Sequence, residues 1–167
     1  MIFRLACLIL LMGCAPSDRL LRTYTDATRV WQTVSRDAEV FRDRKDHVLA
    51  RTIILERDGQ VRYYLSLSFL RGGPNGPRIR EVSAGGQPLA YVRHDRLKAY
   101  CIDHCHKTET GQIALTRAAF RQAANDGVIL QIHGLRRNYD AQIPARLFYS
   151  ALEAANMLEP TRKPLPQ

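Results

Sequence analysis

The sequence predicts an α+β fold, mainly antiparallel β, in which a sandwich-like sheet is joined by two short helices toward the C-terminus. Two observations predict it. Apolar and polar residues alternate with a period of two over much of the chain after residue 28, and the period becomes helical only after Thr116. The chain has 167 residues, 46% hydrophobic and 25% charged, which is typical of one globular domain and argues against a disordered or multi-span membrane protein.

Turn residues divide the first two thirds of the chain into strands. The pair Asp58-Gly59, a strong hairpin signal, separates two runs rich in β-forming residues. Residues 72–77 contain three glycines and two prolines and are expected to form a loop, and the charged residues 36–46 are expected to form a solvated connection. The predicted strands are residues 28–35, 47–57, 60–70, 79–83, 89–94 and 97–102.

The last third of the chain predicts both helices and one more strand. Residues 117–125 are rich in alanine, and Thr116 and Gly127 are a suitable cap and stop for a helix. Residues 128–133 alternate as a strand. Pro144 is placed where a helix start tolerates proline, and the apolar stripe of the helix that follows consists of Leu147, Phe148, Ala151, Leu152 and Ala155.

The N-terminus has the pattern of a signal peptide. Arg4 precedes an apolar run that is far shorter than the roughly 20 residues of a membrane-spanning helix. The run ends in Leu11-Met12-Gly13-Cys14, which resembles the lipobox of bacterial lipoproteins. The resemblance implies cleavage before Cys14 and acylation of that cysteine. Because Ala15 is not the aspartate that resembles an inner-membrane retention signal, it also implies an outer-membrane anchor facing the periplasm.

The expected organisation follows from this anchor. Residues 1–13 are the signal peptide, residues 14–27 are the lipidated cysteine and a tether, residues 28–158 are one β-rich periplasmic domain, and residues 159–167 are a flexible tail. Residues 113–152 run as strand, alanine-rich helix, strand and proline-started helix. In this order they resemble small periplasmic proteins of the invasion-associated locus B type.

The segment from Cys101 to His106 is the densest chemical cluster, and three interpretations compete. A disulfide between Cys101 and Cys105 suits an oxidising periplasm, but it requires a tight turn at residues 102–104, because an extended chain would hold the two Cα atoms ~13 Å apart and a disulfide needs less than ~7 Å. A zinc or copper site would use Cys101, His104, Cys105 and His106. Covalent haem attachment would need a motif one residue shorter.

Other candidate chemistry is sparse. Short motifs of serine hydrolases, zinc proteases and phosphate-binding loops are absent from the sequence. His47 and His94 each stand beside an aspartate, where a loop or turn explains them better than a catalytic pair. His133 ends a predicted strand and either faces a cleft or is a partly exposed strand residue.

Basic residues exceed acidic ones, 25 against 16, but they are dispersed along the chain. They form either a solvated basic surface or a contact with anionic lipid headgroups or acidic envelope polymers. Aromatic residues do not interleave with them as in proteins that stack bases, so no nucleic-acid partner is expected. The short clusters are Arg42, Arg44 and Lys45; Arg78 and Arg80; Arg93, Arg96 and Lys98; and Arg136 and Arg137.

These observations predict a membrane-anchored lipoprotein that acts as a binding or accessory module for an envelope component, without catalytic residues or a cofactor. The expected partners are the membrane, through the N-terminal lipid, and another envelope protein or an anionic envelope polymer. The alternative is a hydrolase of an envelope polymer. A deep cleft lined by histidine, aspartate and tyrosine would favour the enzyme, and a shallow apolar or basic face would favour the binding module.

Overall fold

The computed structural model describes residues 20–44, 46–72, 79–101, 105–135 and 137–157. The predicted signal peptide, Cys14, most of the predicted glycine-proline loop, residues 102–104 and the predicted tail lie outside the described residues. The strands are β1 (Leu21–Thr25), β2 (Val30–Val34), β3 (Ala38–Arg42), β4 (Asp46–Arg57), β5 (Gln60–Gly72), β6 (Ile79–Ala84), β7 (Gln87–Leu89), β8 (Tyr91–Cys101), β9 (Cys105–Leu115), β10 (Val128–Gly134) and β11 (Asn138–Ile143). The helices are α1 (Arg117–Asp126) and α2 (Ala145–Ala154).

Seven of these strands form one large antiparallel sheet in the order β1, β2, β4, β5, β9, β8, with β3 pairing the first half of β4. The predicted hairpin is present: β4 and β5 pair along their length, and Asp58 and Gly59 form the turn. Both have a positive φ, 49° and 76°, as a two-residue turn between twisted strands requires. The long β4–β5 pair is therefore the backbone of the sheet.

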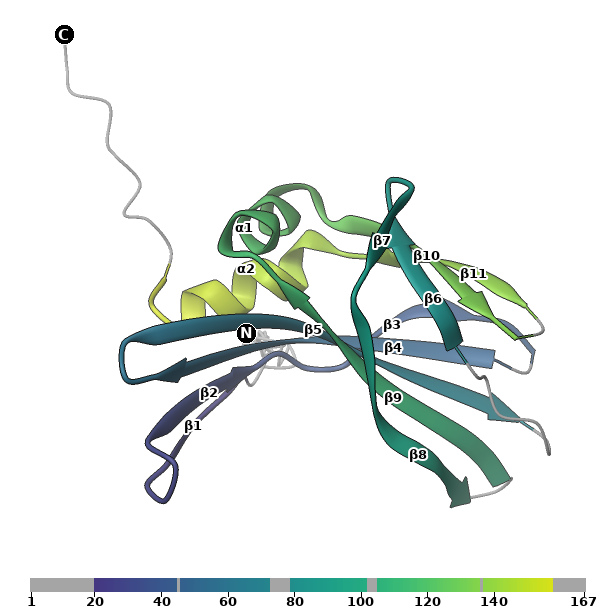
Figure 1. Cartoon of the computed structure of the whole chain (residues 1–167), viewed down its shortest axis with the longest axis horizontal. Coiled ribbons are helices and arrows are strands. Elements are labelled where there is room, and N and C mark those ends of the chain that lie inside the picture. Colours follow the sequence, from purple (N-terminus) through teal and green to yellow (C-terminus); the bar gives the residue numbers. More distant parts are fainter. Residues whose placement is uncertain (1–19, 45, 73–78, 102–104, 136, 158–167) are drawn as a thin grey trace, which may run out of the picture.

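The second layer lies on one face of this sheet. It consists of the two helices and a smaller antiparallel sheet in the order β11, β10, β6, β7, and both parts cover the same side of the large sheet (Figure 1). The hydrophobic core fills the space between the layers. Phe120 of α1 sits at its centre, 5.0 Å from the ring of Tyr63 and 5.1 Å from the ring of Phe148. The predicted α+β sandwich is confirmed.

Both helices begin and end where the sequence predicts, within a residue or two. The Thr116 side chain accepts a hydrogen bond from the Ala119 N–H at 3.1 Å, and Gly127 ends α1 with a φ of 73°. A Cβ at Gly127 would lie 2.7 Å from the Ile143 carbonyl, so only glycine fits there. Helix α2 follows Pro144 and buries most of its predicted apolar stripe against the sheet.

Three predictions of local structure are wrong, and some strands were missed. Residues 21–25, expected in the tether, pair with β2 as strand β1, because Thr and Tyr favour a strand beside a ready partner. Residues 38–42, expected in a connection, form β3 on the edge of β4, where exposed charges are compatible with an edge strand. The two strands expected at 89–94 and 97–102 are largely one strand, β8, with two register irregularities. Strands β7 and β11 were not predicted, and of β9 only the end from residue 113 was.

Candidate functional site

A buried carboxylate joins the large sheet to the small one. Glu109 of β9 is 1% exposed and accepts hydrogen bonds from the Ile79 N–H at 3.2 and 3.3 Å and from the Tyr91 hydroxyl at 3.3 Å. Arg93 Nε lies 3.1 Å from its Oε1. Burial, with the negative charge of Glu109 beside it, raises the pKa of Tyr91 above its usual range. Gly111 leaves room for the Tyr91 ring, whose atoms lie 2.3 Å from where a Cβ would be.

A second buried carboxylate forms a similar joint on the other edge of the small sheet. Asp46, at the start of β4, accepts a hydrogen bond from the Tyr139 hydroxyl of β11 at 3.2 Å, and Arg137 Nη1 lies 3.5 Å from the same oxygen. Arg137 also pairs with Asp43 and lies over the rings of Phe41 and Tyr139. Protein groups hold both buried carboxylates, so these two clusters are joints of the fold rather than sites for a ligand.

The opposite face of the large sheet differs in character. In the part of the chain that the structure describes, the helices and the small sheet all lie on the other side (Figure 1). Side chains there alternate with core residues such as Ala50 and Leu65. We call this surface the second face; its central residues are Leu49, Arg51, Ile53, Tyr64, Ser66, Ser68, Thr110 and Gln112. Most are half-buried, and Ile53 and Ser66 are buried.

The centre of the second face is a row of polar side chains across three strands. Arg51 of β4 stands opposite Ser66 of β5, which stands opposite Gln112 of β9. Ser66 is 1% exposed, and among the described residues neither its Oγ nor the buried Nε of Arg51 has a hydrogen-bond partner. Within the described ranges, no ion pair of Arg51 occurs either. A buried polar atom without a partner costs about 1–3 kcal/mol, so this row is the least satisfied polar group of the second face.

A carboxylate on the same face is already engaged. Glu39 of β3 holds Arg42 Nε at 2.7 and 2.8 Å, and His47 Nδ1 lies 3.5 Å from it. The hydrogen bond from Arg42 lowers the pKa of Glu39, so this carboxylate is charged at neutral pH and committed to its own strand neighbours. Glu39 therefore does not pair with Arg51.

The structure places the predicted cysteine pair at the end of a hairpin. Strands β8 and β9 pair antiparallel, with Cys101 opposite Cys105 in the register. Residues opposite each other in antiparallel strands have Cα atoms about 4.5–5.5 Å apart, within the range of a disulfide. His104 lies outside the described residues, and nothing in the structure describes the side chains of Cys101, Cys105 and His106. The disulfide and the metal site therefore stay predictions.

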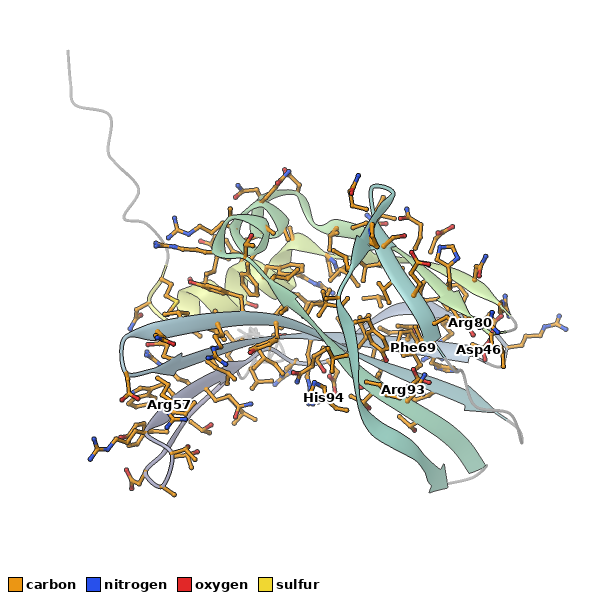
Figure 2. The ribbon with its side chains drawn as sticks, viewed as in Figure 1. Asp46, Arg57, Phe69, Arg80, Arg93 and His94 are labelled. Atoms are coloured by element: carbon orange, nitrogen blue, oxygen red, sulfur yellow. The ribbon has the colours of Figure 1, made fainter. Side chains whose placement is uncertain are left out.

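His47 and His94 lie in strands, as the predicted strands 47–57 and 89–94 place them, and not in the loop or turn that their aspartate neighbours indicated. His47 lies in β4 beside Glu39, and His94 lies in β8, because both segments are extended through the aspartate neighbours. Figure 2 shows His94 and Arg93 on opposite sides of β8. His133 lies near the end of β10, as predicted, and is half-buried.

The surface cavities lined by the described residues include the following three. One, about 690 Å³, lies between β5, β9 and the start of α1, and its charged side chains are Arg62, Arg117 and Arg121. The others, about 450 and 400 Å³, lie beside α2 and beside the β4–β5 turn. No histidine lines any of the three, and the described residues contain no cluster of three or more side chains able to hold a metal ion.

Comparison with known proteins found no matching family model, no matching curated protein and no matching solved structure. The resemblances to lipoproteins and to the locus B type therefore stay predictions. No helix among the described residues has the length and apolar character to cross a membrane.

Sequence reasoning did not single out Arg51 or Ser66. Both lie inside a predicted hairpin whose alternation was assigned to one buried and one polar face. The sequence contained one usable signal: Arg51 interrupts an otherwise β-forming run at the position that pairs with the serine of the partner strand. Water can hydrogen-bond to polar side chains at the ends of the strands. Polar residues that face each other near the middle of two long strands lie far from those ends.

Proposed function

We propose that this protein is a lipid-anchored periplasmic binding module whose second face takes an anionic group of an envelope component. The observation that carries the proposal is the pair Arg51 and Ser66 at the centre of that face, whose buried Nε and Oγ have no hydrogen-bond partner among the described residues. An arginine guanidinium binds carboxylate or phosphate through two parallel hydrogen bonds, and a serine hydroxyl beside it adds a third donor. The lipobox pattern at Cys14 supports the membrane anchor and the compartment.

The ligand class follows from the same geometry. The row Arg51, Ser66 and Gln112 crosses neighbouring strands about 4.8 Å apart, so its donors cover roughly 10 Å of surface. That width suits a single carboxylate or phosphate group with its neighbouring atoms. An acidic envelope polymer supplies such groups repeatedly, and the excess of basic over acidic residues, 25 against 16, favours its approach.

Binding of acidic polymer fragments by the purified protein tests this proposal. Arg51→Gln is expected to weaken binding at least about tenfold, because a hydrogen bond to a charged group contributes about 1.5–3 kcal/mol. Arg57→Gln is the matched control, since Arg57 lies on the same strand and face but is exposed and paired with Asp58 at 3.4 Å. Equal affinities for Arg51→Gln and the unaltered protein would contradict the assignment of the site.

A second measurement tests the module itself. Crosslinking in native membranes followed by pull-down is expected to recover a polymer or an envelope protein, and Arg51→Gln is expected to reduce its yield. Cys14→Ser is expected to release the protein from membranes, because each lost acyl CH₂ removes about 0.8 kcal/mol of membrane affinity. Recovery of no partner, together with turnover of a polymer by the purified protein, would favour the hydrolase instead.

A further inference from the structure

The hairpin formed by β1 and β2 exposes large apolar side chains beside the predicted tether. Leu21 is 64% exposed, Tyr24 45% and Trp31 43%. Tyr24 and Trp31 are cross-strand partners whose ring centroids lie 4.9 Å apart. Arg22, Tyr24 and Trp31 lie on one side of the hairpin, and we call these three residues the hairpin patch; Leu21 lies on the other side. Strand β1 is the edge of the large sheet and pairs only with β2 among the described strands, so the patch projects from the body of the domain (Figure 1).

The patch is held in place by the domain. Arg22 Cζ lies 4.9 Å from the centroid of the Trp31 ring, and its Nη2 lies 3.4 Å from Glu56. Its Nη1 donates to the carbonyl of Ala154 at the end of α2 at 3.4 Å. These contacts fix the orientation of the Trp31 ring without covering it. An ordered aromatic pair that keeps nearly half its surface in water has the character of a contact surface.

We infer that the hairpin patch contacts the lipid surface to which Cys14 is anchored. This inference rests on the proposed lipid anchor. Six residues, 15–20, separate Cys14 from the start of β1 at Leu21, and a chain of that length spans at most about 25 Å however it folds. Tyr24 lies three strand residues further on, about 10 Å. The anchor thus keeps Tyr24, and with it the hairpin patch, within about 35 Å of Cys14.

The chemistry of the patch fits the interfacial zone of a bilayer. Tryptophan and tyrosine favour that zone because each combines an apolar ring with a polar group that stays in the hydrated headgroup layer. Arg22 places a cation beside the rings, where lipid phosphates lie. Contact at this point would orient the domain relative to the membrane.

Trp31 is the only tryptophan of the chain, so its fluorescence reports this contact directly. The full acylated protein is reconstituted into vesicles of phosphatidylethanolamine and phosphatidylglycerol, with and without brominated acyl chains. We expect Trp31 emission to shift to shorter wavelength and to lose most of its intensity with brominated chains. The matched control moves the probe: Trp31→Phe combined with Ile129→Trp, at a position of β10 that is 56% exposed, is expected to keep its emission.

Flotation of the vesicles separates failure of this inference from failure of the anchor. Protein that floats with the vesicles but keeps unquenched Trp31 emission would overturn the hairpin contact and leave the anchor intact. Protein that does not float would overturn the anchor and the inference with it. Equal quenching of both probes, or a larger Trp31 shift with soluble polymer fragments than with vesicles, would also overturn the hairpin contact.

Discussion

Removal of the Glu109 carboxylate is expected to destabilise the whole sandwich, because this side chain joins three strands. Glu109→Ala leaves the Ile79 N–H without its acceptor, and that orphaned donor costs about 1–3 kcal/mol. Loss of one partner of a buried ion pair costs about 3–5 kcal/mol. Arg93 is half-exposed and can turn to water, which reduces the ion-pair cost. We therefore expect a loss of about 3 kcal/mol in the free energy of unfolding.

Glu109→Gln separates the two contributions. The amide oxygen still accepts from Ile79 while the charge is lost, so we expect a loss of about 1 kcal/mol. Urea denaturation followed by circular dichroism measures both variants, and a loss of 3 kcal/mol lowers the midpoint by about 1.5 M. Glu81→Ala, an exposed position on β6, is the control and should change stability by less than about 0.5 kcal/mol. If Glu109→Ala and Glu109→Gln lose equal stability, the orphaned backbone donor is not what costs energy.

Three further predictions concern the same region and its neighbour. Folding raises the pKa of Tyr91, so its contribution to the free energy of unfolding is complete below the unfolded pKa of about 10. Above that pH the contribution falls by up to about 1.4 kcal/mol per pH unit. Urea titrations at about pH 9 and 11 should therefore show a smaller loss of stability for Tyr91→Phe than for the unaltered protein. Gly111→Ala should push the Tyr91 ring away and cost about 1–3 kcal/mol in the same assay, and no loss would mean that the ring moves freely. If Cys101 and Cys105 are bridged, the intact mass should be ~2 Da below that of the reduced protein, with no thiol open to alkylation before reduction, whereas bound zinc or copper would support the metal site.

The sequence predicts the architecture best where a local signal and the tertiary environment agree. The helix after Thr116 and the hairpin at Asp58-Gly59 have both a cap or turn residue and a matching period, and both are present. Strands β1 and β3 lack such agreement. Their charged residues look solvated in sequence, and only an available edge of the large sheet makes them strands.

The candidate site was beyond sequence reasoning for a different physical reason. Alternation shows that Arg51 and Ser66 face away from the core, but it does not show that nothing in the described chain satisfies them. That property depends on the register of three strands and on which face the helices cover. By contrast, the cysteine pair could be found in the sequence. A disulfide between residues only four positions apart requires the chain to turn between them.

Some of the buried polar groups have hydrogen-bond partners within the described part of the protein and others do not. This difference predicts that the residues that bind a ligand lower the stability of the fold. Glu109 and Asp46 are held by donors from neighbouring strands, so their removal should destabilise the fold. Arg51 receives no such compensation from the described chain. Replacing an uncompensated charge with an apolar side chain of similar volume is often stabilising, so Arg51→Met should raise the free energy of unfolding by about 1 kcal/mol while abolishing anion binding. Urea denaturation and a binding titration on the same sample measure both effects, and a variant that loses stability would show that Arg51 serves the fold rather than a ligand.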